Sequence, residues 1–328
     1  MRKTTKKILI TGSGGFIGSH LTEECIRRGY SIKAFFHYNS LNRLGWMENS
    51  KYKDKMEVVM GDVRDFDSVN SAMDGCESVI HLAALIGIPY SYVSPLAYIK
   101  TNIVGTYNII ESAKIHKLKK VIITSTSETY GTAQYVPINE QHPSVGQSPY
   151  SATKIGADAL AVSYFRSFNL PVTIVRPFNT YGPRQSNRAI IPNIISQALL
   201  GKDKIRLGNI FPTRDFTFVD DTVNGFLEIF NSNNLKGEVV NVGMNQEISI
   251  KELVELISQI VGHKMTVSKD VNRYRPDKSE VERLWCDNSK ILKYTSWRPQ
   301  YNLKKGLTKT IAWFRKNKDA YKDGLYKI

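Results

Sequence analysis

The chain has 328 residues, 41% hydrophobic and 23% charged, a balance that fits a folded globular protein and excludes a disordered one. Its net charge of +15 would suit an acidic partner, but the basic clusters lack the interleaved aromatic residues of a single-strand nucleic-acid surface. Cys25, Cys76 and Cys286 are odd in number and have no metal-like spacing. We therefore predict no nucleic-acid partner, no disulfide and no metal.

The N-terminal segment is basic, but the apolar run at residues 8–11 stops at a glycine cluster, which is too short for a signal peptide or a membrane span. No later apolar run approaches the length that a membrane-crossing helix needs. We therefore expect a cytoplasmic protein with no membrane partner.

Short apolar runs alternate with amphipathic stretches over the first 180 residues. The apolar runs predict buried strands at residues 7–11, 31–36, 56–60, 78–82, 120–124 and 172–176. The amphipathic stretches predict helices at residues 16–28, 67–73, 96–116 and 150–168. Strands that alternate with helices favour an α/β fold with a Rossmann-type doubly wound parallel sheet, covered by helices on both faces.

After residue 176 the pattern changes to proline- and glycine-rich turns, shorter strands, and separate helices at residues 250–261 and 303–315. This composition predicts a smaller α/β C-terminal substrate lobe that closes over a ligand at the carboxyl edge of the sheet. We divide the chain into a dinucleotide-binding domain at residues 1–180 and a substrate-binding lobe at residues 181–328. We expect the chain to cross between the two parts more than once.

The first predicted strand leads through a glycine-rich turn directly into the first predicted helix. Gly12 permits the tight turn, Gly15 lets the backbone approach a pyrophosphate, and Gly18 lets the helix pack closely on the strand. The helix N-terminus offers free N–H groups to phosphates. The sequence therefore predicts a dinucleotide site here, formed by Gly12, Gly14, Gly15, Phe16, Ile17 and Gly18.

The end of the second predicted strand bears on the choice of dinucleotide. An NAD site usually carries Asp or Glu at this place to hold the ribose hydroxyls, but here the chain has His37, Tyr38 and Asn39. Asn39 could bind a free 2′-hydroxyl, whereas Arg43 or His37 could bind a 2′-phosphate. We expect NAD, with NADP as the alternative.

Two further strand ends complete the predicted cofactor site. Asp62 and Val63 follow the third strand, where they are placed to meet the adenine. Leu82, Ala83 and Ala84 end the fourth strand, where the cofactor backbone would pass. The carboxyl ends of parallel strands meet at one edge of a sheet, so we expect these residues to line one site.

Two later segments carry the candidate chemistry. Tyr150 and Lys154 stand one helical turn apart, so both side chains leave the same face of the helix. Thr126 and Glu128 follow the strand at residues 120–124. Together these residues form a set of groups that can move a hydride and a proton from a secondary alcohol, and Glu128 is one further base.

These motifs match a known family: the chain resembles the extended short-chain dehydrogenase/reductases that act on nucleotide sugars. The matching positions are Thr11 to Gly18, Asp62-Val63, His81 to Ala84, Asn102, Ser125 to Gly131, Tyr150 to Lys154, Arg176 to Arg184 and Arg214 to Phe216. Within the family, Thr126-Ser127-Glu128 resembles GDP-mannose 4,6-dehydratase and the dehydratases of legionaminic and pseudaminic acid synthesis. The second group is the closer likeness.

The resemblance implies a nucleotide-sugar 4,6-dehydratase, a lyase, with Asn102 in the cofactor site. Tyr150 would take the proton of the sugar 4-hydroxyl as hydride leaves C4 for the nicotinamide, and Thr126 would hold that hydroxyl. A neighbouring Lys154 ammonium would favour the Tyr150 phenolate. Glu128 would remove the C5 proton while the 6-hydroxyl departs as water, and hydride return to C6 would give a 4-keto-6-deoxy sugar.

One position departs from a related group, because dTDP-glucose 4,6-dehydratases carry Asp where this chain has Ser127. Either Glu128 also protonates the leaving hydroxyl, or Ser127 relays that proton. The family pattern further implies that Asn179, Arg184, Arg214 and Arg275 bind the substrate diphosphate, with Arg283 as a further candidate. It also implies a homodimer packed through the helices at residues 96–116 and 150–168.

Several alternatives remain open from the sequence. A UDP-glucuronate decarboxylase shares the Thr126-Ser127-Glu128 motif but needs a cation on the substrate carboxylate. A 4-epimerase would use Tyr150 and Lys154 without needing Glu128, and a 5-epimerase would use the same carboxylate to invert C5. The nucleotide of the substrate (UDP, GDP or dTDP) and the sugar, for which we favour an N-acetylglucosamine type, also stay open. A dinucleotide-binding module without catalysis is the non-enzymatic alternative.

Overall fold

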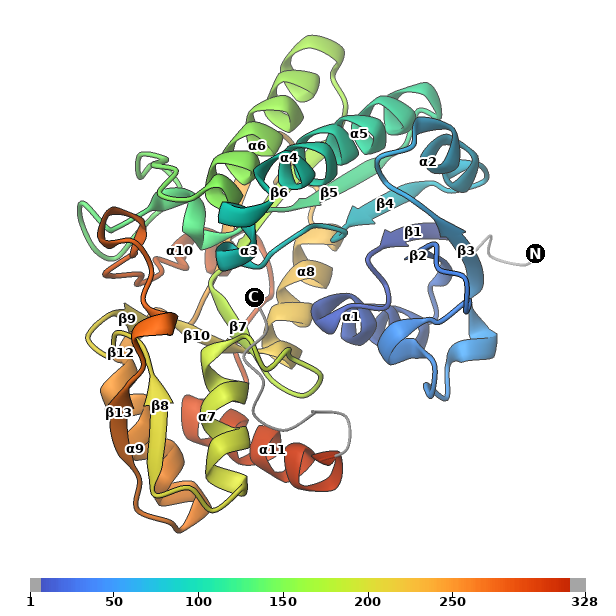
Figure 1. Cartoon of the computed structure of the whole chain (residues 1–328). Helices are drawn as coiled ribbons and strands as arrows, with labels where there is room; N and C mark the ends of the chain where they lie inside the picture. Colours follow the sequence, from blue (N-terminus) through green and yellow to red (C-terminus); the bar gives the residue numbers. More distant parts are fainter. Residues whose placement is uncertain (1–6, 319–328) are drawn as a thin grey trace.

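The structure is built on a seven-stranded sheet in which all neighbouring strands run parallel (Figure 1). The computed structural model describes residues 7–318, except for the side chains of Asn272 and Asp277. The strands lie in the order β11 (Val239–Val242), β6 (Val172–Pro177), β5 (Lys120–Thr124), β4 (Ser78–His81), β1 (Lys7–Thr11), β2 (Ser31–His37) and β3 (Glu57–Gly61). This is the Rossmann-type doubly wound sheet that the sequence predicted, with its reversal of strand order between β1 and β4.

Alternate residues of the central strands face two separate apolar layers. Ile8 and Ile10 pack in one cluster with side chains of α1 (Phe16–Arg27) and α8 (Val219–Asn231). Leu9 faces the opposite side, in a cluster with side chains of α2 (Phe66–Met73), α5 (Gly105–Ile115) and α6 (Pro149–Phe168). Strands that are buried on both faces explain why their sequences read as continuous apolar runs.

The predicted helix at residues 96–116 is divided in the structure. It consists of α4 (Pro95–Tyr98), the π-helical segment η3 (Ile99–Val104) and α5, and a short helix α3 (Ile88–Val93) precedes it. A π-helical segment is rare and often lies near a functional site. Here the widened turn carries Asn102, whose buried side chain bonds to residues outside the helix.

The chain after β6 holds short paired strands and several helices. Parallel pairs join β7 (Asn179–Tyr181) to β10 (Phe216–Phe218) and β8 (Lys204–Leu207) to β13 (Thr266–Lys269), and β9 (Thr213–Arg214) pairs antiparallel with β12 (Ile248–Ser249). The helices α7 (Ile190–Leu199), α9 (Ile250–Val261) and α11 (Leu303–Lys316) lie together at the bottom of Figure 1, while α10 (Ser289–Tyr294) lies beside β11. Strand β11 follows residue 180 but completes the central sheet, so the sheet draws on both predicted parts of the chain.

Short 3-10 turns connect several of these elements: η1 (Gly45–Met47), η2 (Lys53–Lys55), η4 (Ser127–Tyr130), η5 (Val271–Arg273) and η6 (Asp277–Ser279). Within residues 7–318, no helix combines the length and the apolar character that crossing a membrane requires. The same residues contain no group of three or more His, Cys, Asp or Glu side chains suited to a metal. Cys25, Cys76 and Cys286 are all buried free thiols.

Candidate active site

The carboxyl ends of β1, β4 and β5 lie side by side, because β4 pairs with both of the other strands. In a doubly wound sheet, ligands bind at this edge where the strand order reverses. The three strand ends carry the glycine turn, the Leu82-Ala83-Ala84 segment and the Thr126–Glu128 segment. The topology therefore brings the predicted cofactor and catalytic segments to one edge.

The glycine turn has the geometry that a pyrophosphate requires. Gly12 has a φ of +73°, and an added Cβ would lie 2.9 Å from the backbone nitrogen of Ala83. An added Cβ at Gly18 would lie 2.0 Å from the Gly12 carbonyl oxygen, so only glycine allows α1 to pack this closely. Gly15 is exposed, and α1 has neither a side-chain cap nor an acidic residue in its first turn. Its first N–H groups are therefore free for a phosphate.

Thr11 organises the neighbouring end of β4. Its hydroxyl oxygen accepts hydrogen bonds from the backbone N–H groups of Leu82 and Ala83, both at 3.2 Å. Since these two bonds occupy the oxygen as acceptor, the hydroxyl proton is free to go to Nδ1 of His81 at 2.7 Å. Complete burial lowers the pKa of His81 to about 3, so this imidazole is neutral and accepts the bond.

The residues predicted around the adenosine end have distinct surroundings. Asn39 uses its amide within its own loop, accepting from Arg43 N at 2.9 Å and donating to Arg43 O at 3.0 Å. The Arg43 side chain is exposed. The Asp62 carboxylate pairs with Arg64, which holds its pKa below the usual range, and Val63 is buried beside Gly105.

Asn102 connects the loop after β4 to α6. Its amide oxygen accepts from Leu85 N at 2.9 Å, and its amide nitrogen donates to Leu85 O at 3.0 Å and to Thr153 Oγ1 at 3.1 Å. Ala84, the last residue predicted on this strand end, is half-buried just before that loop. The Asn102 amide thus fixes the protein backbone that borders the cofactor site.

Thr126, Glu128 and Tyr150 lie together at the end of β5. Thr126 caps η4, and its hydroxyl oxygen accepts from Glu128 N at 3.2 Å. Tyr150 is the second residue of α6, which is capped by the reciprocal hydrogen bonds of Ser148 and Ser151. Burial raises the pKa of Tyr150, a hydrogen bond with Thr126 lowers it in part, and the Glu128 charge raises it further. Ser127 is buried in the same turn.

Lys154 is buried on the same helix, and its ammonium donates to Thr124 O at 2.6 Å. Burial lowers the pKa of Lys154 to about 8, and the Asp158 carboxylate opposes this shift. That the Lys154 ammonium favours the Tyr150 phenolate stays a prediction. The pKa of Tyr150 is raised, because desolvation of its phenolate outweighs the favourable interactions.

The buried ion pair between Asp158 and Arg176 was not predicted, and the Asp158 charge acts on both Tyr150 and Lys154. Asp158 accepts hydrogen bonds from Ser125 Oγ at 2.8 Å and from the Arg176 guanidinium at 2.8 and 3.1 Å. Arg176 also lies 4.7 Å from the ring centre of Tyr130. The only sequence signal was the position of Asp158 one turn after Lys154, which places both on one helix face.

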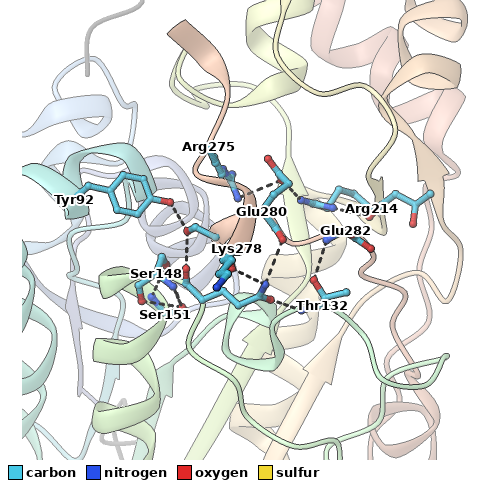
Figure 2. Close-up of polar contacts among 12 residues, drawn as sticks. Tyr92, Thr132, Ser148, Ser151, Arg214, Arg275, Lys278, Glu280 and Glu282 are labelled. Carbon is cyan, nitrogen blue, oxygen red and sulfur yellow. Dashed lines mark hydrogen bonds and ion pairs between the residues drawn. The ribbon is translucent and has the colours of Figure 1, made fainter. Parts of the chain in front are cut away.

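Two of the four predicted diphosphate ligands lie together (Figure 2). Arg214 is buried on β9 and donates to Glu280 Oε1 at 3.3 Å, while Arg275 Nη1 lies 3.8 Å from the same oxygen. Burial lowers the pKa of Arg214, the Glu128 charge raises it, and the Arg275 charge lowers it again. The charges of Glu128 and Arg275 therefore both act on Arg214.

The other two predicted ligands make different contacts. Arg184 has a φ of +70° and pairs with Glu23 of α1 at 3.1 Å. Asn179 begins β7, and its buried Oδ1 has no hydrogen-bond partner among the described residues. Arg283, the further candidate, pairs with Glu247. No side-chain hydrogen bond or ion pair joins these three to Arg214 or Arg275 within residues 7–318.

Arg188 is an exposed cation that sequence analysis missed. An added Cβ at Gly87 would lie 3.6 Å from its Nη1, and its charge acts on Tyr98. Tyr98 packs edge-on against Tyr150, with ring centres 6.3 Å apart. Arg188 lies in a loop without a motif of its own, so only the fold reveals its position near Tyr150.

The chain is similar to known proteins over nearly its whole length. The sequence model of the GDP-mannose 4,6 dehydratase family matches residues 9–310. A UDP-N-acetyl-alpha-D-glucosaminuronate decarboxylase of Bacillus cytotoxicus is 32% identical, over 94% of this chain and 98% of its own length.

Two crystal structures are similar over nearly the whole chain. The dTDP-glucose 4,6-dehydratase of Streptomyces venezuelae, crystallised with NAD, has a TM-score of 0.86 and 27% identity, covering 96% of this chain and 99% of its own. The UDP-glucuronic acid 4-epimerase of Bacillus cereus, crystallised with UDP-glucuronic acid and NAD, has a TM-score of 0.85 and 28% identity, covering 94% and 99%. The chain belongs to the GDP-mannose 4,6-dehydratase family of nucleotide-sugar enzymes.

Proposed function

We propose that this protein is an NAD-dependent nucleotide-sugar 4,6-dehydratase. The observation that carries the proposal is the position of Glu128, in the turn capped by Thr126 and close enough to Tyr150 for its charge to act on the phenol. A 4-epimerase needs one base at the 4-hydroxyl, whereas dehydration needs a second base at C5. The site offers both.

In the proposed reaction, Tyr150 takes the proton of the sugar 4-hydroxyl, and the Thr126 hydroxyl holds that oxygen. Glu128 then removes the proton at C5, which a ketone at C4 makes acidic, while the C6 oxygen leaves as water. Either Glu128 or Ser127 delivers the proton that this leaving oxygen needs. Return of the C4 hydride to C6 and of a proton to C5 would then give a 4-keto-6-deoxy sugar that remains linked to its nucleotide.

NAD fits the site because the glycine turn leaves no room for a side chain at Gly12 and Gly18, and no side chain caps the first N–H groups of α1. The turn at Gly12 to Gly18 would hold the pyrophosphate, and Asp62 and Val63 would border the adenine. Bound NAD would supply the hydride acceptor for C4 and, when oxidised, a positive charge that favours the Tyr150 phenolate. The exposed Arg43 keeps NADP as the alternative.

A decarboxylase is the second candidate, because Arg214 is a buried cation within electrostatic reach of Glu128. Arg214 would supply the cation that a sugar carboxylate requires, and a relative of this chain is a decarboxylase. In the dehydratase, Arg214 instead binds the diphosphate together with Arg275.

The test is mass spectrometry of the NAD-loaded protein incubated separately with UDP-N-acetylglucosamine, GDP-N-acetylglucosamine, GDP-mannose and UDP-glucuronate. Loss of one water from one of the first three supports the dehydratase and identifies its nucleotide. Loss of carbon dioxide from UDP-glucuronate would replace it with the decarboxylase. An unchanged mass together with a new sugar isomer would replace it with a 4- or 5-epimerase.

The proposal includes a homodimer formed through α4, η3, α5 and α6. Large apolar side chains are exposed along these helices, among them Leu96, Ile99, Tyr107, Ile115 and Phe168. Leu96, for example, is 59% exposed. Several exposed apolar side chains on neighbouring helices are unusual for a monomer. A second copy of the chain would cover them. The cytoplasmic location stays a prediction.

A further inference from the structure

Glu280 lies between the two arginines that the proposed function assigns to the substrate diphosphate (Figure 2). One oxygen, Oε1, faces both guanidinium groups, at 3.3 Å from Arg214 Nη2 and 3.8 Å from Arg275 Nη1. The two arginines are close enough to repel each other, since the Arg275 charge lowers the pKa of Arg214. The Glu128 and Glu280 charges both favour the charged form of Arg214, and Glu280 is the carboxylate that pairs with both arginines.

The pairing leaves part of the cationic site unsatisfied. Arg275 Nη1 is buried and has no hydrogen-bond partner among the described residues, because 3.8 Å to Glu280 is too long for a hydrogen bond. Arg214 Nη1 donates to Thr213 O at 2.9 Å, which leaves its Nη2 for an anion. A diphosphate has more oxygens and a larger negative charge than one carboxylate, so it would satisfy both guanidinium groups better.

The backbone around Glu280 is anchored on both sides. Gln147 Nε2 donates to Lys278 O at 3.2 Å and to Glu280 O at 3.3 Å, and Ser279 Oγ donates to Gln147 O at 2.6 Å. After Glu280, the Glu282 N–H donates to Thr132 Oγ1 at 3.2 Å. The side chain of Glu280, in contrast, pairs only with the two arginines within the described residues. Its carboxylate can therefore rotate away while the backbone stays in place.

We propose that Glu280 is a resident counter-ion of the diphosphate site, which the substrate diphosphate must displace from Arg214 and Arg275. The proposal rests on the proposed function, because it assumes that these two arginines bind the substrate. A diphosphate and the Glu280 carboxylate carry the same sign of charge, so they compete for the N–H groups of the two arginines. Glu280 thus weakens the binding of every diphosphate ligand and keeps Arg214 and Arg275 paired when no ligand is bound.

The test is calorimetric titration of the NAD-saturated protein with inorganic pyrophosphate and with UDP, at about 0.15 M salt. Saturating NAD covers the glycine turn, and pyrophosphate has no ribose or base, so the titration reports the cationic site alone. Glu280→Gln should bind both ligands more tightly by on the order of tenfold. Glu282→Gln is the matched control, because it removes an exposed carboxylate from the same segment, and we expect a change below about twofold.

The proposal is overturned if Glu280→Gln binds pyrophosphate no more tightly than the wild type, or if Glu282→Gln gives an equal gain. Weaker UDP binding with unchanged pyrophosphate binding would make Glu280 a nucleoside contact instead, and absence of pyrophosphate binding in every variant would remove the site. Thermal unfolding checks that each variant is folded. If Glu280→Gln does not fold, Glu280→Ala is tested in its place. The titration measures binding and no turnover. A failure of the dehydratase assignment would therefore appear in the product masses and not in this experiment.

Discussion

In the proposed dehydratase, Glu128 is the residue that separates dehydration from 4-epimerisation, since 4-epimerisation requires no base at C5. In Glu128→Gln, we expect C4 oxidation to survive while water elimination falls by on the order of a hundredfold, the effect of losing a general base. The check is product mass, with the absorbance of reduced nicotinamide followed in the same sample. Glu282→Gln serves as the control, and unchanged product formation in Glu128→Gln would contradict the assigned role.

Lys154 carries a charge that is unfavourable for folding. Its pKa falls from 10.5 to about 8 on burial, so the unfolded chain binds the additional proton between these values. The destabilisation is complete below pH 8 and vanishes as the pH rises past 10.5. Lys154→Met should therefore gain more stability over the wild type at pH 7 than at pH 10, by about 2 kcal/mol. Urea unfolding at both pH values measures this, and a pH-independent difference would refute it.

Short-range spacing explains which site residues the sequence could reveal. Tyr150 and Lys154 were predictable as a pair because one helical turn separates them, and Thr126 and Glu128 because a strand ends just before them. Glu280 was not predictable, since it meets Arg214 across 66 positions of the chain. Arg188 was not predictable for the same reason, because only the fold of the chain brings its charge near Tyr98.

At the level of elements, substitutions at Gly15 and Gly18 test the binding of NAD and the packing of α1 independently. Gly15 has an extended backbone (φ −78°, ψ −179°), and its nearest atom to an added Cβ is the Gly12 oxygen at 3.2 Å. Gly15→Ala should therefore keep its stability within about 1 kcal/mol but weaken NAD binding by about tenfold or more. Calorimetric titration with NAD and thermal unfolding of the same sample measure the two effects.

Gly18→Ala is the complementary variant, because its Cβ would meet the Gly12 oxygen at 2.0 Å. We expect it to lose about 1–3 kcal/mol of stability, as an overpacked helix contact does. If both variants lost stability equally, or if Gly15→Ala bound NAD as tightly as the wild type, the assignment of Gly15 to the pyrophosphate would be wrong.

The strands of the sheet were predictable to within one or two residues, because double burial leaves continuous apolar runs. Lys120–Thr124 was predicted with the observed bounds. Strand β11 was not predicted, since its four residues lie among loops and become a strand only by pairing with β6. The π-helical segment was also missed, because the apolar spacing of residues 96–116 fits one continuous helix and carries no sign of the wider turn.

For the whole molecule, the exposed apolar side chains on α4, η3, α5 and α6 predict a dimer. Ile99→Asp, on η3, should convert it to a monomer at micromolar concentration, because a charge would be buried in the contact. Phe211→Asp is the control, since Phe211 is exposed on the C-terminal lobe outside these helices. Light scattering coupled to gel filtration measures the mass. A monomeric wild type, or equal dissociation of both variants, would contradict the dimer.

The family and the general chemistry of the molecule were visible in its sequence, because the glycine turn and the Tyr150–Lys154 pair are local motifs. The balance between dehydration, decarboxylation and epimerisation was not. It depends on how Glu128, Arg214 and the bound sugar are arranged, and the two residues lie far apart in the sequence.

The most direct test of the central claim is to run the reaction in heavy water with the preferred nucleotide sugar and to measure the mass of the product. The 4-ketone is reduced with borohydride at once, so that no deuterium exchanges afterwards. Because Glu128 removes the C5 proton and solvent supplies its replacement, we predict a product that has lost one water and carries deuterium on carbon at C5. A product that retains its water, or one that loses water without solvent deuterium at C5, would contradict the account.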